Sequence, residues 1–128
     1  MLTNNHFNNG LLFLSYLIIA ADGVIDETEV DALKKICQYE GISLDYLDNF
    51  MRYVKVLPEK EVYNKGLEEI SMCEDEEKLR AFGWLYRISE VDGTVHVKEI
   101  RFLIYSLKKA GIDFEDIISE KDKLPALF

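Results

Sequence analysis

The apolar residues of this chain recur at the three- and four-residue spacing of α-helices. Within residues 27–40, for example, they are Val30, Leu33, Ile36 and Cys37. This spacing places them on one face of a helix. Strand-like alternation of apolar and polar residues, bounded by hairpin signals, does not occur anywhere in the sequence. The pattern therefore predicts an all-α protein, with about seven short helices in a single bundle.

Residues that start and stop helices set the predicted boundaries. Gly41 and Gly111 are typical of the position that follows a helix. Ser43 is a typical N-cap, and Pro58 suits a first helical position. The predicted helices cover about residues 6–21, 27–40, 43–54, 58–72, 74–91, 97–110 and 113–121.

One motif, Asp-Gly-x-aliphatic-x-x-x-Glu, occurs at residues 22–29 and again seventy positions later, at 92–99. Aligning residues 12–42 with 82–112 gives eight identities. In the first copy the identical positions are Tyr16, Ile18, Asp22, Gly23, Glu29, Leu33, Gly41 and Ile42. A repeat this short cannot cover its own apolar face, so the two copies should pack on each other. We predict a duplicated helix–(Asp-Gly turn)–helix unit with a pseudo-two-fold relation.

Length and composition are consistent with one domain built around a real core. The chain has 128 residues, and its 48% hydrophobic content argues against disorder. We predict a single domain over residues 1–128. Its parts are repeat 1 (about 7–42), connecting helices (43–72), repeat 2 (about 74–112) and a C-terminal helix (113–122).

The charge of the chain narrows the choice of partners. The net charge is −9, and no Lys or Arg precedes Lys34. Such an acidic protein repels phosphate backbones, which argues against nucleic acid. Cations and basic protein surfaces are better expectations.

Two further features indicate a cytoplasmic protein. Cys37 and Cys73 stand alone without a metal-binding spacing, and we read them as buried free thiols. Residues 10–21 are strongly apolar, but no basic residue precedes them, as a signal peptide would require. They are also shorter than the ~20 residues of a membrane span. We therefore expect a core helix and no membrane span.

The Asp-Gly motif has a purely structural explanation. Asp26 can cap the helix that follows, while Glu29 reaches back to the Asp26 amide, which makes a capping box. His96 and Glu99 take the same places in the second copy. On this interpretation the motif serves only folding.

A calcium-binding EF-hand loop is a second interpretation. The motif coincides with positions five to twelve of such a loop. Position one would then be Ile18 in the first copy and Ile88 in the second. Because an aliphatic side chain cannot donate a ligand oxygen, we reject a true EF-hand.

Two such units in a small acidic helical chain resemble the tellurite-resistance TerB family, which includes TerB-like domains attached to DnaJ-type co-chaperones. The resemblance covers roughly residues 7–120. Residues 21–29 match the family motif closely. The second copy departs from it, because Val91 stands where the family usually has Ala, with Ser89 and Glu90 ahead of it.

The resemblance implies a cytoplasmic, non-catalytic stress-response domain whose acidic residues bind metal and whose surface binds a partner protein. By position, the implied metal ligands are Asp22, Glu29, Asp92 and Glu99. Secondary candidates by proximity are Asp26, Glu27, Glu90 and His96. Carboxylate oxygens favour Ca²⁺, Mg²⁺ or Mn²⁺.

Two other functions compete with the metal-binding module. A protein–protein adaptor, whose acidic turns are only helix caps, is the alternative, and a homodimer is one assembly open to it. A hydrolase using the paired carboxylates is disfavoured, because the sequence has no phosphate-binding loop, nucleophile elbow or His-Glu-x-x-His motif. We therefore expect that the protein is not an enzyme.

Overall fold

The computed structural model describes residues 5–20, 25, 27–91, 108, 111–125 and 127. Over these residues the fold consists of six packed α-helices and contains no strand. The helices are α1 (His6–Ile19), α2 (Glu27–Glu40), α3 (Leu44–Val54), α4 (Glu59–Ser71), α5 (Asp75–Ser89) and α7 (Phe114–Lys121). The predicted all-α class is confirmed. The helix predicted for 97–110 falls, except for Lys108, outside the described residues.

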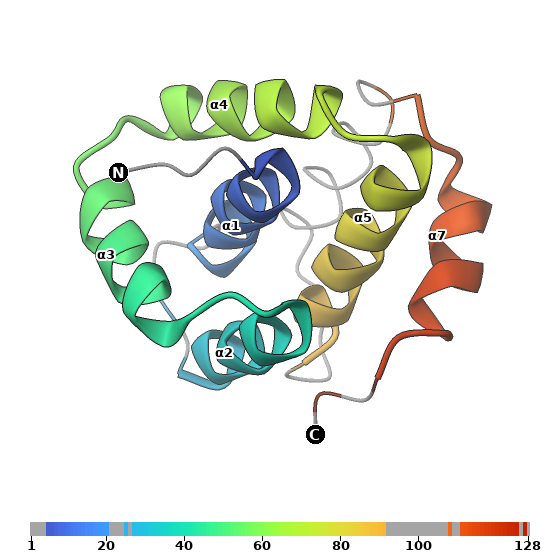
Figure 1. Ribbon diagram of the computed structural model, residues 1–128, viewed down its shortest axis with the longest axis horizontal. Helices are drawn as coiled ribbons and strands as arrows, with labels where there is room; N and C mark the ends of the chain where they lie inside the picture. The colour runs from blue at the N-terminus through green and yellow to red at the C-terminus, as the bar shows by residue number, and fades with distance from the viewer. Residues whose placement is uncertain are drawn as a thin grey trace.

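Helix α1 lies at the centre of the fold, and its composition explains why. Eleven of its fourteen residues are buried, so neighbouring helices must cover it on every side. Figure 1 shows α1 in the middle, with α2, α3, α4 and α5 around it and α7 outside α5. The strongly apolar run of this helix, residues 10–19, therefore lies in the core of the bundle.

Local sequence signals determine the helix ends largely as predicted. The Ser43 hydroxyl accepts a hydrogen bond from the Tyr46 amide over 3.1 Å, which confirms the predicted cap of α3. Gly41 adopts φ 73° and Gly111 φ 72°, the left-handed conformation that favours glycine after a helix. Pro58 differs slightly from the prediction, because it lies just before α4 and not at its first position.

Two glycines allow α1 and α4 to approach each other closely. A Cβ added at Gly66 would lie 2.6 Å from Leu14 Cδ2, and one added at Gly10 would lie 2.7 Å from Ile70 Cδ1. No larger residue fits at either position without movement of its neighbour. Between α1 and α3, Phe13 packs edge-to-face on Phe50, with ring centroids 5.0 Å apart.

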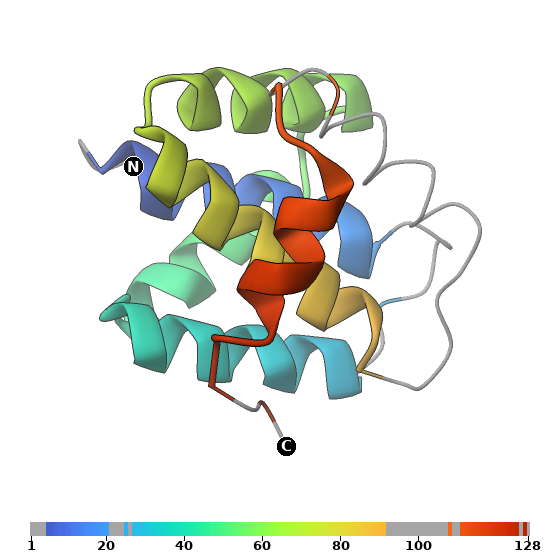
Figure 2. The same ribbon diagram turned by 90° about the vertical axis from the view of Figure 1, so that its right-hand side faces the viewer.

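Helix α7 covers the outer face of α5, as Figure 2 shows. Ile117 is fully buried, and a Cβ at Gly83 would lie 3.4 Å from Glu120 Cγ of α7, so the two helices are in close contact; the same Cβ would lie 3.0 Å from Leu124 Cδ1, just beyond α7. Leu127 is also buried. The C-terminal segment therefore packs against the core at this residue.

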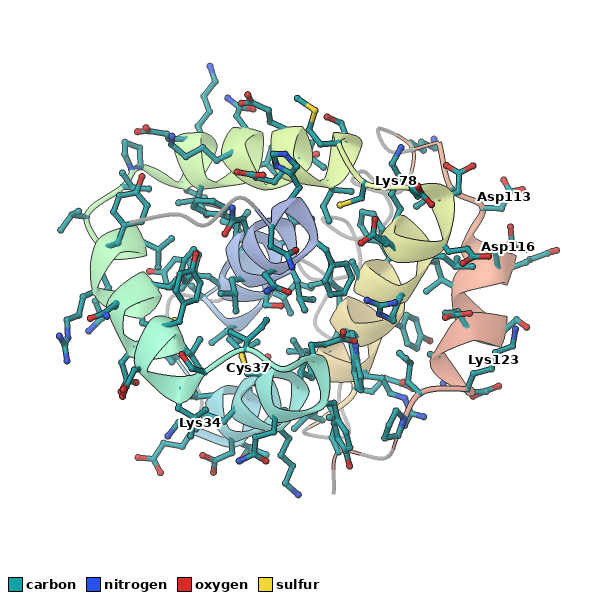
Figure 3. The ribbon with its side chains drawn as sticks, in the orientation of Figure 1. Lys34, Cys37, Lys78, Asp113, Asp116 and Lys123 are labelled. Carbon is teal, nitrogen blue, oxygen red and sulfur yellow. The ribbon has the colours of Figure 1, made fainter. Side chains whose placement is uncertain are left out.

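Both cysteines are free thiols, as predicted. Cys37 is buried, and Figure 3 shows it on the side of α2 that faces α1, whereas Lys34 points away from the bundle. Cys73 is only half-buried, whereas we predicted that it would be buried. Among the residues described above, no helix combines the length and apolar composition that a membrane crossing would need.

Candidate functional site

The structure describes three of the eight predicted ligand positions: Glu27, Glu29 and Glu90. The other five lie outside the described residues: Asp22, Asp26, Asp92, His96 and Glu99. Over the described part of the chain, no three His, Cys, Asp or Glu side chains gather closely enough to hold a metal ion. Only these three glutamates can therefore be compared with the predicted metal site.

Glu29 is the informative member of the first motif. It lies in the first turn of α2 and is only 5% exposed. Its buried position follows from helical spacing, since the core residues Ala32 and Leu33 lie three and four positions further on. A buried carboxylate must be compensated by strong donors or by a cation. Glu27, two residues earlier, is exposed to solvent.

Glu90 takes part in a different arrangement, at the contact between α5 and α7. Its Oε1 lies 3.2 Å from Lys121 Nζ. The same ammonium lies 5.0 Å from the centre of the Tyr86 ring, a cation–π geometry. An ammonium group thus already stands where a metal ion would need to approach Glu90.

A polar network built around the buried Asn9 joins α1, α3 and α4, and the sequence pattern did not indicate it. Asn9 is completely buried; its Oδ1 accepts from the Tyr46 hydroxyl over 2.9 Å, and its Nδ2 donates to Glu69 Oε1 over 3.4 Å. The other carboxylate oxygen of Glu69 contacts His6 Nδ1. The signal available in the sequence was the Asn8-Asn9 pair near the start of a helix whose other residues are mostly apolar. Because every member is paired, we interpret this network as a fixed structural element.

A second cluster joins the end of α2 to α5. Glu40 Oε2 accepts hydrogen bonds from Arg80 Nε over 3.0 Å and from Trp84 Nε1 over 2.7 Å. Trp84 is buried, and Tyr39 stacks on it with centroids 5.9 Å apart and planes at 15°. Tyr39 is nevertheless 53% exposed. The cluster therefore presents a fixed aromatic ring to solvent.

A pocket of about 170 Å³ lies beside the last turn of α1. Its lining residues come from that turn, from the α3–α4 connection and from the start of α4: Tyr16, Leu17, Ala20, Leu57 and Glu59. Sequence periodicity did not indicate it, because the pocket forms between segments about forty residues apart.

No protein-family model, curated protein or solved structure matches the chain.

Proposed function

We propose that this protein is a cytoplasmic, non-catalytic TerB-like stress-response module whose first acidic turn binds a divalent cation. The main support is the burial of Glu29, which closes the motif at residues 22–29 and is 5% exposed. A capping glutamate has no need of such burial, whereas a carboxylate ligand gains from it, because attraction to a cation strengthens in a less polar setting. Carboxylate chemistry favours Ca²⁺, Mg²⁺ or Mn²⁺.

The two motifs differ as cation sites. Glu29 fits a ligand role through its burial, and Glu27 could contribute only from the solvent side. In the proposed site, Asp22 and Asp26 supply the remaining carboxylates. Glu90, next to the second motif, is neutralised by Lys121. The proposal therefore places the cation at the first motif.

The duplication belongs to the same proposal, and several equivalences support it. Helices α1 and α5 end at Ile19 and Ser89, seventy positions apart. Gly41 and Gly111 share the same φ, and each amide donates to the carbonyl three residues back, over 3.4 and 3.2 Å. Such matched helix ends are expected of two copies of one unit.

A protein–protein adaptor is the second candidate, and Tyr39 favours it. Interface hot spots are enriched in aromatic residues whose position is fixed before binding. Tyr39 has these properties, since it is 53% exposed and stacked on Trp84. On this reading the acidic turns only cap helices, and the partner, a second copy included, contacts the end of α2.

Thermal unfolding in the presence of each ion separates the two candidates. A ligand that binds only the folded state stabilises it by about 2.7 kcal/mol at one hundred times its Kd. The cation proposal expects the midpoint to rise with one of Ca²⁺, Mg²⁺ or Mn²⁺, and expects Glu29→Gln to lose that rise. Equal midpoints with and without all three ions would leave the adaptor as the better account.

A further inference from the structure

The pocket beside the last turn of α1 has no role in the proposed cation site, and it has the size of a binding site for a small molecule. One buried water needs roughly 15 Å³, whereas this pocket measures about 170 Å³. It therefore has room for a small organic group. Figure 2 shows α1 running away from the N-terminus, so this last turn lies on the opposite side of the molecule.

The electrostatic surroundings of the pocket favour a positive ligand. The last turn of α1 brings the negative end of the helix dipole to the pocket, and it contains no basic residue that would offset it. Glu59 is the first residue of α4, where its full negative charge outweighs the roughly half-unit positive end of that helix's dipole. Within the described part of the chain Glu59 forms no ion pair. An anionic ligand would be repelled by both groups.

The remaining lining favours a cation that also has an apolar body. Leu17, Ala20 and Leu57 provide apolar walls, and the half-buried Tyr16 adds an aromatic ring that can attract a cation. A divalent metal ion would need six or more oxygen ligands, and the pocket offers one carboxylate. An ammonium on a short alkyl chain meets both requirements.

We propose that this pocket binds a primary alkylammonium group. The methylenes pack against Leu17, Ala20 and Leu57, and the nitrogen lies at Glu59. Two sources share this chemistry: the side chain of a lysine on a partner protein, and a free alkylamine. This inference is independent of the cation at the first acidic motif, so either can fail without the other.

Nuclear magnetic resonance titration of the full chain tests the proposal with n-butylammonium, and with n-butanol and butyrate as matched probes. We expect saturable shifts at the amides of Ala20 and Leu57, with a Kd in the millimolar range that is typical of so small a ligand. Butanol should bind at least about threefold more weakly, and butyrate should not bind. Equal binding of butanol, or no shift with butylammonium, would overturn the proposal.

Two variants then test whether the nitrogen of the ligand lies at Glu59. Glu59→Gln should weaken butylammonium binding up to about fivefold, the upper range for an exposed ion pair. Glu68→Gln, which removes the same charge from an exposed position on α4 away from the pocket lining, should leave the Kd unchanged. If the two variants behave alike, the nitrogen does not lie at Glu59 and the assignment is wrong.

A third probe distinguishes the two sources. In Nα-acetyl-lysine N-methylamide the same alkylammonium is attached to a peptide backbone, which must stay outside the pocket. Binding at least as tight as that of butylammonium assigns the pocket to a lysine of a partner protein. Binding of butylammonium alone assigns it to a free amine. If neither binds, the proposal fails.

Discussion

Arg87 on α5 donates hydrogen bonds from Nε and Nη2 to the backbone carbonyl of Lys121, the last residue of α7, over 3.0 and 2.8 Å. Its Nη2 also donates to the Leu124 carbonyl over 3.1 Å. Carbonyls at a helix C-terminus lack partners within the helix. One guanidinium therefore supplies the missing donors and holds α7 against α5.

Replacing Arg87 with Lys should destabilise the protein by about 1–3 kcal/mol. An ammonium is a single point charge and cannot reproduce the fork of donors that contacts both carbonyls. Arg52→Lys, on the exposed side of α3, is the control and should change stability by less than about 0.5 kcal/mol. Urea unfolding measures both. Equal stabilities for the two variants would mean that Arg87 does not hold α7 in place.

Gly66→Ala should destabilise the protein by about 1–3 kcal/mol, because its Cβ would overlap Leu14 at the contact between α1 and α4. Helix propensity alone predicts the opposite, since Ala stabilises a helix by up to ~1 kcal/mol relative to Gly. The sign of the change therefore distinguishes close packing from propensity. Asn64→Ala, exposed on the same helix, is the control. Chemical denaturation in which Gly66→Ala is more stable than wild type would contradict the close approach.

The proposed duplication can be tested at one pair of equivalent leucines. Leu33 is buried with 1% exposure, so Leu33→Ala should cost ~2–5 kcal/mol. Leu103, seventy positions later, lies outside the described residues, and the duplication predicts a similar cost for Leu103→Ala. The two unfolding free energies decide the matter. A Leu103→Ala variant as stable as wild type would rule out a pseudo-two-fold relation.

The two thiols should make stability fall at high pH. Burial raises the pKa of Cys37 from 9.0 to about 12. Burial, followed in size by the negative charge of Glu77, raises the pKa of Cys73 from 9.0 to about 11. Above pH 9 the unfolded chain releases protons that the folded state keeps, so the stabilising contribution is complete below pH 9 and is lost as pH rises toward 11 and 12. Cys37→Ala should therefore lose less stability than wild type between about pH 8 and pH 10. Parallel losses in the two proteins would show that Cys37 does not titrate as its burial predicts.

The helices were predictable because local signals determine them. The contacts between segments distant in the sequence were not predictable. Gly41, Ser43 and the apolar stripe of α2 act within one or two turns, so their effects can be read directly from the sequence. The partner of Asn9 is Tyr46, thirty-seven residues away, and that of Glu40 is Trp84, forty-four residues away. Nothing in the spacing of polar residues indicates such pairs.

The candidate site was predictable in the same limited way. The repeated motif drew attention to Glu29, whose burial is unusual for a charged residue. The ion pair between Glu90 and Lys121 depends on how α7 docks on α5, which no local pattern of residues indicates. The pocket at Tyr16 likewise depends on where the α3–α4 connection passes α1.

We propose above all that the first acidic motif binds a divalent cation through Glu29. Calorimetric titration of the full chain with Ca²⁺, Mg²⁺ and Mn²⁺ tests it directly, using Glu29→Gln and, as control, Glu76→Gln, which removes an exposed carboxylate from the start of α5. The claim predicts saturable binding of one ion to wild type and to Glu76→Gln, and at least about tenfold weaker binding to Glu29→Gln, since an amide oxygen lacks the charge that offsets dehydration of the ion. Gln can still cap a helix, so the metal-free stability of Glu29→Gln should match wild type. No binding of any of the three ions to wild type at millimolar concentration, or equal affinity in Glu29→Gln, would contradict the claim.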